Sequence, residues 1–145
     1  MFKRAINFSI IILVIAFSFG CATTQSIPAE QRSRIYNRAF KDTFRSVVQA
    51  LNERGYSIEQ ADSDTGIINT DFKSASTLEA FLTGDSRTKI NAIIADQNNG
   101  TKVTLTIKAE KKGALTGWES QSMTKKQAKN MYNDVFSDIS KKVNS

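Results

Sequence analysis

The sequence predicts an α+β domain in which an antiparallel sheet of four to five strands packs on two helices, a helix-grip-like arrangement in the order β-α-β-β-β-β-α. Three observations support this prediction. Apolar residues recur at helical spacing over residues 40–51 and again over residues 128–143. Between these stretches, short segments alternate in polarity, as half-buried strands do. Two of the segments flank Asn99-Gly100, the strongest short-range signal for a β-hairpin.

The N-terminal segment has the pattern of a secretory signal. Two basic residues precede an apolar run, residues 5–19, which is too short to span a hydrocarbon core of about 30 Å. The following Ser18-Phe19-Gly20-Cys21 resembles the lipobox at which bacterial lipoproteins are cleaved and acylated. That resemblance implies cleavage after Gly20 and a covalent lipid on Cys21, the only cysteine of the chain. The alternative is a buried free cysteine, which is a common fate of a lone thiol.

Lipidation of Cys21 also sets the expected location. Residue 22 is Ala22, whereas in enterobacterial lipoproteins an Asp at this position is the usual signal for retention in the inner membrane. The resemblance therefore implies an outer-membrane protein on the periplasmic face, held in the membrane by its lipid. We expect residues 1–20 to be removed, residues 21–31 to form a lipidated tether and residues 32–145 to form one periplasmic domain. The removed segment carries two cations, so the formal charge falls from +6 to +4, which does not argue for a nucleic-acid partner.

The first elements of the domain follow in order. The stretch Arg32-Ser33-Arg34-Ile35-Tyr36 predicts a short first strand. A helix over residues 38–54 is predicted next, because one face of it is apolar. The residues of that face are Phe40, Phe44, Val47, Val48 and Leu51. Gly55 is expected to stop this helix, since glycine readily adopts the left-handed conformation that ends helices.

Four strands are predicted in the middle of the chain. Residues 56–60 and 67–72 alternate in polarity on either side of a turn at residues 61–66. Residues 89–95 and 102–110 form the second pair, around the hairpin signal. In the last of these strands the apolar side chains all point one way; they are Val103, Leu105, Ile107 and Ala109. One apolar and one polar face indicate a sheet that is covered on one side.

A final amphipathic helix supplies the cover. Thr124 and Gln127 form a capping-box pattern at its start. Its apolar stripe consists of Ala128, Met131, Tyr132, Val135, Phe136, Ile139 and Val143. A sheet that grips this helix and the first one would bury both stripes.

The residues that carry these elements also resemble known proteins. The stretch SRIYNRAFKDTFRSVVQALNERGYSIEQADSDTGIINTDF, together with MYNDVFSDISKKV near the end, resembles a family of small uncharacterised bacterial outer-membrane lipoproteins. The helix-then-hairpin signature is similar to the helix-grip domains of BamC, an accessory lipoprotein of the outer-membrane β-barrel assembly machinery. The shared motifs are turn glycines and core aromatics, so the resemblance implies a fold and carries no catalytic residue across.

Several kinds of chemistry are excluded by composition. The chain has no histidine, which rules out Ser-His-Asp and Cys-His catalysis and every His-based zinc site. With Cys21 acylated, no thiol remains for a disulfide. Asp62-Ser63-Asp64-Thr65-Gly66 begins like a calcium loop, but the fifth position is Gly66 and the twelfth is Lys73, so a hairpin turn explains it better. We therefore expect no metal and no cofactor beyond the covalent lipid.

A carboxylate pair is the catalytic option that needs no histidine. Glycoside hydrolysis uses two acids about 5 to 9.5 Å apart in a cleft. Glu59, Asp71, Glu79 and Glu119 are available, and none lies in a recognisable motif. A carboxylate-based hydrolase is therefore a remote alternative, and we expect the protein not to be an enzyme.

Lysines occur in three clusters, Lys111-Lys112, Lys125-Lys126-Lys129 and Lys141-Lys142. They could contact anionic lipid headgroups or wall polymer. The simpler interpretation, which we favour at this stage, is a solvated polar surface.

Two connections carry apolar residues of special interest. Leu78, Phe81 and Leu82 lie between the predicted hairpins, and Leu115 and Trp118 precede the last helix. Such residues can tuck over the core, or they can be exposed together and anchor a protein partner. We expect a non-catalytic interaction or assembly-accessory module that binds another envelope protein through these loops and an exposed edge strand. The alternative is a carrier of a small molecule or lipid, since a sheet wrapped around a helix can enclose a cavity.

Overall fold

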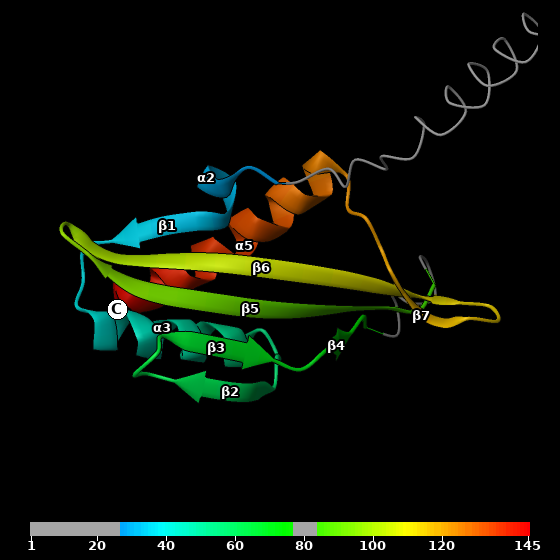
Figure 1. Cartoon of the computed structure of the whole chain (residues 1–145), viewed down its shortest axis with the longest axis horizontal. Helices are drawn as coiled ribbons and strands as arrows, with labels where there is room; N and C mark the ends of the chain where they lie inside the picture. The colour runs from blue at the N-terminus through cyan, green and yellow to red at the C-terminus, as the bar shows by residue number, and fades with distance from the viewer. Residues whose placement is uncertain (1–26, 77–83) are drawn as a thin grey trace, which may run out of the picture.

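An antiparallel sheet organises the part of the chain that the structure describes, residues 27–76 and 84–145 of a computed structural model. Its five core strands lie in the order β1-β6-β5-β3-β2 (Figure 1). Their bounds are Ser33–Tyr36 for β1, Ile58–Asp62 for β2, Ile67–Thr70 for β3, Ser86–Gln97 for β5 and Gly100–Gly113 for β6. Two shorter strands extend the sheet: β4, Lys73–Ser74, pairs with β5, and β7, Gly117–Ser120, pairs with β6.

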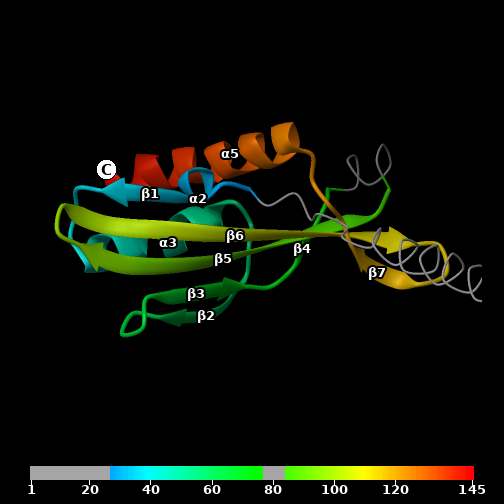
Figure 2. The ribbon, with the colours of Figure 1, turned by 45° about the horizontal axis from the view of Figure 1, so that its top comes forward.

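Two long helices pack on one face of this sheet (Figures 1 and 2). Helix α3 spans Phe40–Glu53 and helix α5 spans Lys125–Val143, and the two also pack against each other. The opposite face of the sheet carries none of the described helices. The α+β prediction is therefore confirmed, with five core strands and two main helices.

The hydrophobic core fills the space between the helices and the sheet. Its largest fully buried apolar side chains, each less than 2% exposed, are Val47, Leu51, Ile68, Ile90, Val103, Leu105, Val135, Phe136 and Ile139. On β6 the predicted alternation is confirmed: Val103, Leu105 and Ile107 are buried, whereas Thr106 and Lys108 face solvent. The core therefore has the one-sided pattern that the sequence indicates.

Helix α3 is rotated relative to its predicted apolar stripe. Val47 and Leu51 are fully buried, but Phe40 and Phe44 are only half-buried and stack on each other with ring centroids 6.0 Å apart. The remaining buried positions of the helix include Thr43, which is 0% exposed. Ser46 is also buried, and its hydroxyl donates to the carbonyl of Lys142 on α5 at 3.3 Å, so small polar residues of α3 lie against the second helix while the two rings pack at the margin of the core.

Both helix-end predictions are confirmed. Gly55 has φ +81° and follows the last turn of α3. The backbone N–H of Gly55 donates to Asn52, and that of Tyr56 donates to Leu51 at 3.0 Å, the two bonds of a Schellman motif. At the start of α5, the Thr124 hydroxyl accepts from the Gln127 N–H, and the Gln127 side chain accepts from the Thr124 N–H at 3.0 Å.

The β5–β6 hairpin is confirmed, with its turn one residue earlier than predicted. Gln97 pairs with Gly100, so the turn consists of Asn98 and Asn99. Gly100 lies against β1 with φ +133°, and a Cβ there would collide with the carbonyl oxygen of Tyr36. Glycine is therefore needed at this position for close approach of two backbones as well as for the turn.

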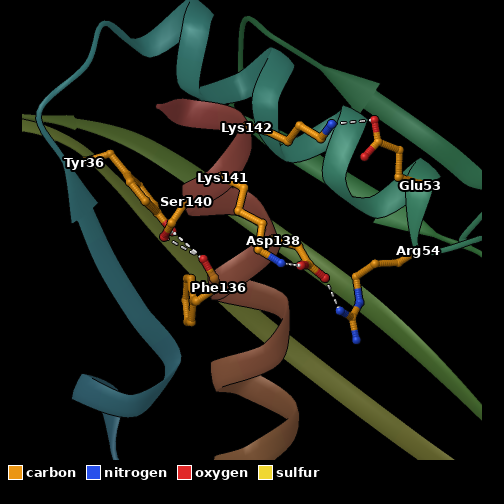
Figure 3. A network of polar contacts seen from close by, with 8 residues as sticks. All are labelled: Tyr36, Glu53, Arg54, Phe136, Asp138, Ser140, Lys141 and Lys142. Atoms are coloured by element: carbon orange, nitrogen blue, oxygen red, sulfur yellow. Dashed lines mark hydrogen bonds and ion pairs between the residues drawn. The ribbon is translucent and has the colours of Figure 1, made fainter. Parts of the chain in front are cut away.

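A set of polar contacts ties α5 to α3 (Figure 3). Asp138 accepts from Arg54 and from Lys141, the latter at 2.8 Å, and Lys142 pairs with Glu53 at 2.7 Å. The hydrogen bond from Lys141, followed by that from Arg54, holds the pKa of Asp138 below its ordinary value. The hydrogen bond from Lys142 lowers the pKa of Glu53 in the same way.

The same end of α5 also contacts the first strand. The hydroxyl of Tyr36 lies 3.3 Å from the Ser140 hydroxyl oxygen and donates to the carbonyl of Phe136 at 3.4 Å (Figure 3). Burial raises the pKa of Tyr36, which is 8% exposed. Strand β1 is thus joined to the helical layer as well as to β6.

The edges of the core sheet are its two outer strands, β1 and β2. The first pairs with β6 over four residues, from Ser33 opposite Thr104 to Tyr36 opposite Thr101. The second pairs with β3 through a register shift between Ile58 and Gln60. One edge is therefore short and the other is irregular.

Three short elements were not expected. Helix α2, Ala29–Arg32, overlaps the last three residues of the expected tether, residues 21–31, and it contacts α5 and β1. Strand β4 pairs with Thr88 and Arg87 of β5. Strand β7 lies in the connection expected to be a loop before the last helix. Helix α2 and strand β4 gain packing or pairing with residues farther along the chain, whereas β7 pairs locally with the end of β6; segments this short show no clear periodicity.

Candidate functional site

The β5–β6 hairpin extends beyond the rest of the sheet. Strand β1 pairs with β6 only as far as Thr104, and β3 pairs with β5 only as far back as Asn91. The far ends of the two strands, Ser86–Thr88 of β5 and Ala109–Gly113 of β6, project past the helices and are joined by β4 and β7 (Figure 1). We call this projection, with the β6–β7 turn at its end, the arm.

Arg87 holds the side chains of the arm together. Its guanidinium carbon lies 4.2 Å from the ring centroid of Phe72 and 4.3 Å from that of Trp118. Its nitrogens also bond Glu110, directly opposite on β6, at 2.6 and 2.7 Å. An arginine is suited to this role because its planar group can stack on rings while its edge binds a carboxylate.

The end of the arm is apolar and exposed. Gly113 pairs with Gly117, and the turn between them carries Leu115, which is 99% exposed. Trp118 follows on β7, is 37% exposed and is not part of the core cluster. The structure therefore brings two of the predicted partner-binding residues onto one hairpin, away from the core. The other three, Leu78, Phe81 and Leu82, lie outside the described residues, as do Gly20 and Cys21.

A polar hollow of ≈ 320 Å³ lies at the base of the arm. Its lining residues are Tyr56, Lys73, Ser74, Ala75, Ser86, Arg87 and Thr88. The Tyr56 hydroxyl lies 2.8 Å from the Thr88 hydroxyl oxygen, and the Lys73 ammonium lies 5.4 Å from the Tyr56 ring centroid. The hydroxyls and cation at this site could bind a polar segment of a partner docked on the arm.

The uncovered face of the sheet is the other large exposed surface. Ile35 and Ile93 on this face are 49% and 57% exposed. Ile93 pairs with Ile67 of β3, and the Oδ1 atom of Asn91 is buried without a hydrogen-bond partner in the described part of the chain. The flanking side chains, such as Lys89 and Thr106, are polar, so the apolar groups on this face are small, such as the Ile67–Ile93 pair.

The acidic residues considered for catalysis or metal binding lie apart. Glu59 on β2 pairs with Lys89 at 3.1 Å, and Glu119 on β7 accepts from Thr116. Asp71 is exposed just after β3, and Glu79 lies outside the described residues. Within residues 27–76 and 84–145, no three acidic or cysteine side chains are grouped so that they could hold a metal ion.

The segment that resembles the start of a calcium loop is a turn, as predicted. The Asp62 carboxylate accepts from the backbone N–H groups of Asp64 at 2.9 Å and Thr65 at 3.2 Å. These bonds, that from Asp64 most strongly, lower the pKa of Asp62. The carboxylate is thus used within its own turn, as Asp commonly is.

Comparisons with known proteins find similarity to solved structures. No family model matches the sequence, and no curated protein matches it. Among solved structures, the chain is similar to a DUF4468 family protein from Bacteroides ovatus, with a TM-score of 0.48 and 11% sequence identity. The match covers 86% of this chain and 92% of that chain. We transfer no residue and no function from it. Among the residues that the structure describes, no helix is both long and apolar enough to cross a membrane.

Sequence reasoning found the apolar ends of the arm and missed its centre. Arg87, Phe72 and Glu110 were not candidates, because an arginine, an aromatic residue and a glutamate on three separate segments form no local pattern. The available signal was the turn between β6 and β7, where Gly113 and Gly117 bracket three residues ahead of an alternating Trp-Glu-Ser.

Proposed function

We propose that this chain is a lipid-anchored envelope protein that acts as a non-catalytic interaction module, and that the arm binds a partner protein. The observation that carries the proposal is the 99% exposure of Leu115 at the end of a projecting hairpin. A leucine in that position loses contact with water only when a partner covers it, which favours association by about 1.5–3 kcal/mol.

The arm is built to present this leucine rigidly. Trp118 is held on Arg87, and Arg87 is held by Glu110, so the side chains below the tip are already ordered before a partner binds. Preorganisation reduces the entropy lost on association. Tryptophan, arginine and phenylalanine are also the residue types that dominate the binding energy or the composition of protein interfaces.

The anchor and location in this proposal rest on the sequence. The pattern around Gly20 and Cys21 supports lipidation, and Ala22 supports an outer-membrane, periplasmic location. The resemblance to small outer-membrane lipoproteins, and to one domain of BamC, supports an accessory role in an envelope assembly. An anchored domain with a projecting arm would reach a partner while staying at the membrane.

The carrier alternative has less support. A lipid or small-molecule carrier needs a cavity, and the natural place for one is between the sheet and the helices. The residues that face this space, such as Leu51, Leu105 and Phe136, are 0% exposed and pack in one cluster. A filled core of this kind favours function at the surface.

The proposal is tested by placing a photo-crosslinking amino acid in the full chain in cells. Leu115 is the test position, and Asn98, exposed in the turn at the other end of the β5–β6 hairpin, is the control position. We expect one defined membrane-associated product from position 115 and none from position 98. Equal crosslinking to many proteins from both positions would contradict a specific site on the arm.

Variants at the same surface give an independent measurement. Leu115→Ser and Trp118→Ala should each reduce recovery of the crosslinked partner, the first by about tenfold, corresponding to the loss of about 1.4 kcal/mol of binding free energy. Ile93→Ser, which changes an exposed isoleucine on the uncovered sheet face, is the matched control and should have no effect. Equal loss in Leu115→Ser and Ile93→Ser would place the interface elsewhere.

A further inference from the structure

The structure separates the three lysine clusters. Lys141 and Lys142 pair with Asp138 and Glu53 at 2.8 and 2.7 Å, so this cluster joins the helices together. In the second cluster Lys112 lies 3.8 Å from Asp85. Lys125, Lys126 and Lys129 form no ion pair with any described residue. This third set, which we call the α5 lysines, therefore has no partner that accounts for it within residues 27–76 and 84–145.

The α5 lysines also stand where cations are unfavourable. Thr124 caps the helix, so Lys125 and Lys126 occupy its first two positions, and the first turn contains no acidic residue. The N-terminus of a helix carries a partial positive charge and favours anions. These lysines therefore lower the stability of α5, and residues that break a local rule without a structural gain are commonly retained for function.

A hollow of ≈ 420 Å³ opens beside the α5 lysines. Its lining residues are Ile27, Pro28, Gln31, Met123, Lys125, Lys126 and Lys129. Ile27 and Met123 pack against the core, so the hollow has an apolar floor and a cationic rim. That combination matches an anionic amphiphile, whose headgroup is negative and whose glycerol and upper chains are apolar.

The position of the anchor places this hollow near a membrane. Ile27, where the described chain begins, lines the hollow and follows Cys21 by six residues in the sequence. Six residues span at most about 20 Å when fully extended. With Cys21 acylated, Ile27 therefore lies within about 20 Å of the anchored cysteine, so the tether lets the hollow and the α5 lysines reach the lipid surface, where cations are attracted to anionic headgroups.

We propose that the α5 lysines and the hollow beside them dock on anionic phospholipid headgroups of the leaflet that holds the anchor. This proposal rests on the lipid anchor of the proposed function. The docking fixes one side of the domain against the membrane instead of leaving it free on the tether. Three cations favour an anionic surface over a neutral one by on the order of 100-fold, and the preference falls as salt is added.

Amine labelling of the anchored protein tests the proposal. The full mature protein, purified from cell membranes, is reconstituted into vesicles of phosphatidylethanolamine with either phosphatidylglycerol or phosphatidylcholine. Each lysine is then labelled with an amine-reactive reagent and its rate read by mass spectrometry. We expect Lys125, Lys126 and Lys129 to react about tenfold more slowly in phosphatidylglycerol vesicles, because an anionic surface covers them. Lys111 and Lys141 are the controls in the same molecule and should react equally in both.

Four other outcomes overturn the proposal. Equal protection in both kinds of vesicle means that the tether alone brings the lysines to the surface. Protection that survives 0.5 M salt means that charge is not responsible. Slow labelling already in neutral detergent means that the lysines are protected without any anionic membrane surface. No protection in vesicles that carry the protein removes the contact altogether.

The lipid anchor is tested separately, by flotation with vesicles. Protein that does not float with phosphatidylcholine vesicles lacks the anchor, which contradicts the proposed function. In that case, slower labelling of the α5 lysines when phosphatidylglycerol vesicles are added still decides whether this surface binds anionic lipid. A second measurement follows the oxidation of Met123, which lines the hollow. Phosphatidylglycerol vesicles should protect Met123 from an added oxidant in the wild type. This protection should be lost in the variant Lys125→Gln/Lys126→Gln/Lys129→Gln. The matched variant Lys41→Gln/Lys108→Gln/Lys111→Gln, at exposed positions on other elements, should keep it.

Discussion

Reversing charges at the two ends of α5 should change stability in opposite directions. The first variant is Lys125→Glu/Lys126→Glu, which replaces two cations in the first turn of the helix. The second is Lys141→Glu/Lys142→Glu, which replaces two cations in the last turn. Both variants change the net charge of the protein equally. Any difference between them therefore reports the position of the charges and not their number.

The magnitude follows from the helix dipole and the ion pairs. One unit of charge at an exposed helix end is worth about 0.3 kcal/mol at the lower limit of measured values. Each variant changes four units, so the N-terminal one should raise the free energy of unfolding by about 1.2 kcal/mol. The C-terminal one should lower it by about the same amount, and further because the ion pairs with Asp138 and Glu53 are lost.

The assay is thermal and urea unfolding of the mature protein in neutral detergent, followed by circular dichroism. At low salt we expect the midpoint to rise by about 5 °C for the N-terminal variant and to fall by at least that much for the C-terminal one. In 1 M salt, where the screening length is about 3 Å, both shifts should shrink. The reasoning would be refuted if the N-terminal variant were no more stable than the wild type. It would also be refuted if the changes in the unfolding midpoint did not depend on salt concentration. If the α5 lysines are kept for docking, the more stable variant should also lose its protection by anionic vesicles.

Three further predictions concern other parts of the domain. Thr43 is 0% exposed, and its hydroxyl has no hydrogen-bond partner among the described residues. Thr43→Val should therefore raise the free energy of unfolding, measured in urea, by about 1 kcal/mol. A loss of stability would show that the hydroxyl is hydrogen-bonded. The pKa values of Asp138 and Glu53 are lowered in the folded protein, so the stability they contribute is present at neutral pH and is lost as the pH falls below their ordinary values of 3.8 and 4.5. Asp138→Asn should therefore flatten the acid limb of a stability–pH curve, and an unchanged slope would contradict this. Arg87→Lys keeps the charge but not the planar group between two rings, so amide hydrogen exchange in β7 should become faster by about three- to fivefold while global unfolding stays unchanged.

The elements that could be predicted from the sequence are those whose signal is local. The stripe on α5, with Val135 and Phe136 at its centre, repeats at the period of a helix and is buried as expected. The hairpin was visible because Asn99-Gly100 separates two alternating segments. The end of α3 was visible because only glycine readily adopts the conformation of Gly55.

The elements that could not be predicted depend on contacts between distant residues. Phe40 and Phe44 were expected on the core face of α3 and are only half-buried, whereas Thr43 and Ser46 are buried and the Ser46 hydroxyl donates to Lys142 on α5. The arm escaped prediction for the same reason, since Phe72, Arg87 and Trp118 meet only in the folded chain. The surface that the sequence could name was the exposed apolar end of the arm, and the residues that support it had no signature of their own.

The two edge strands of the core sheet limit association between copies of the domain through their sheets. A sheet whose last strand is long and regular offers a row of free backbone N–H and C=O groups to which a neighbouring molecule can add a strand. Here one edge offers the four residues of β1, and the other is interrupted between Ile58 and Gln60. On the proposed function, copies of the anchored protein would share a thin layer, where encounters between them are frequent. Edges of this kind would keep such encounters from growing into continuous sheets between molecules, and would leave the arm available to the proposed partner.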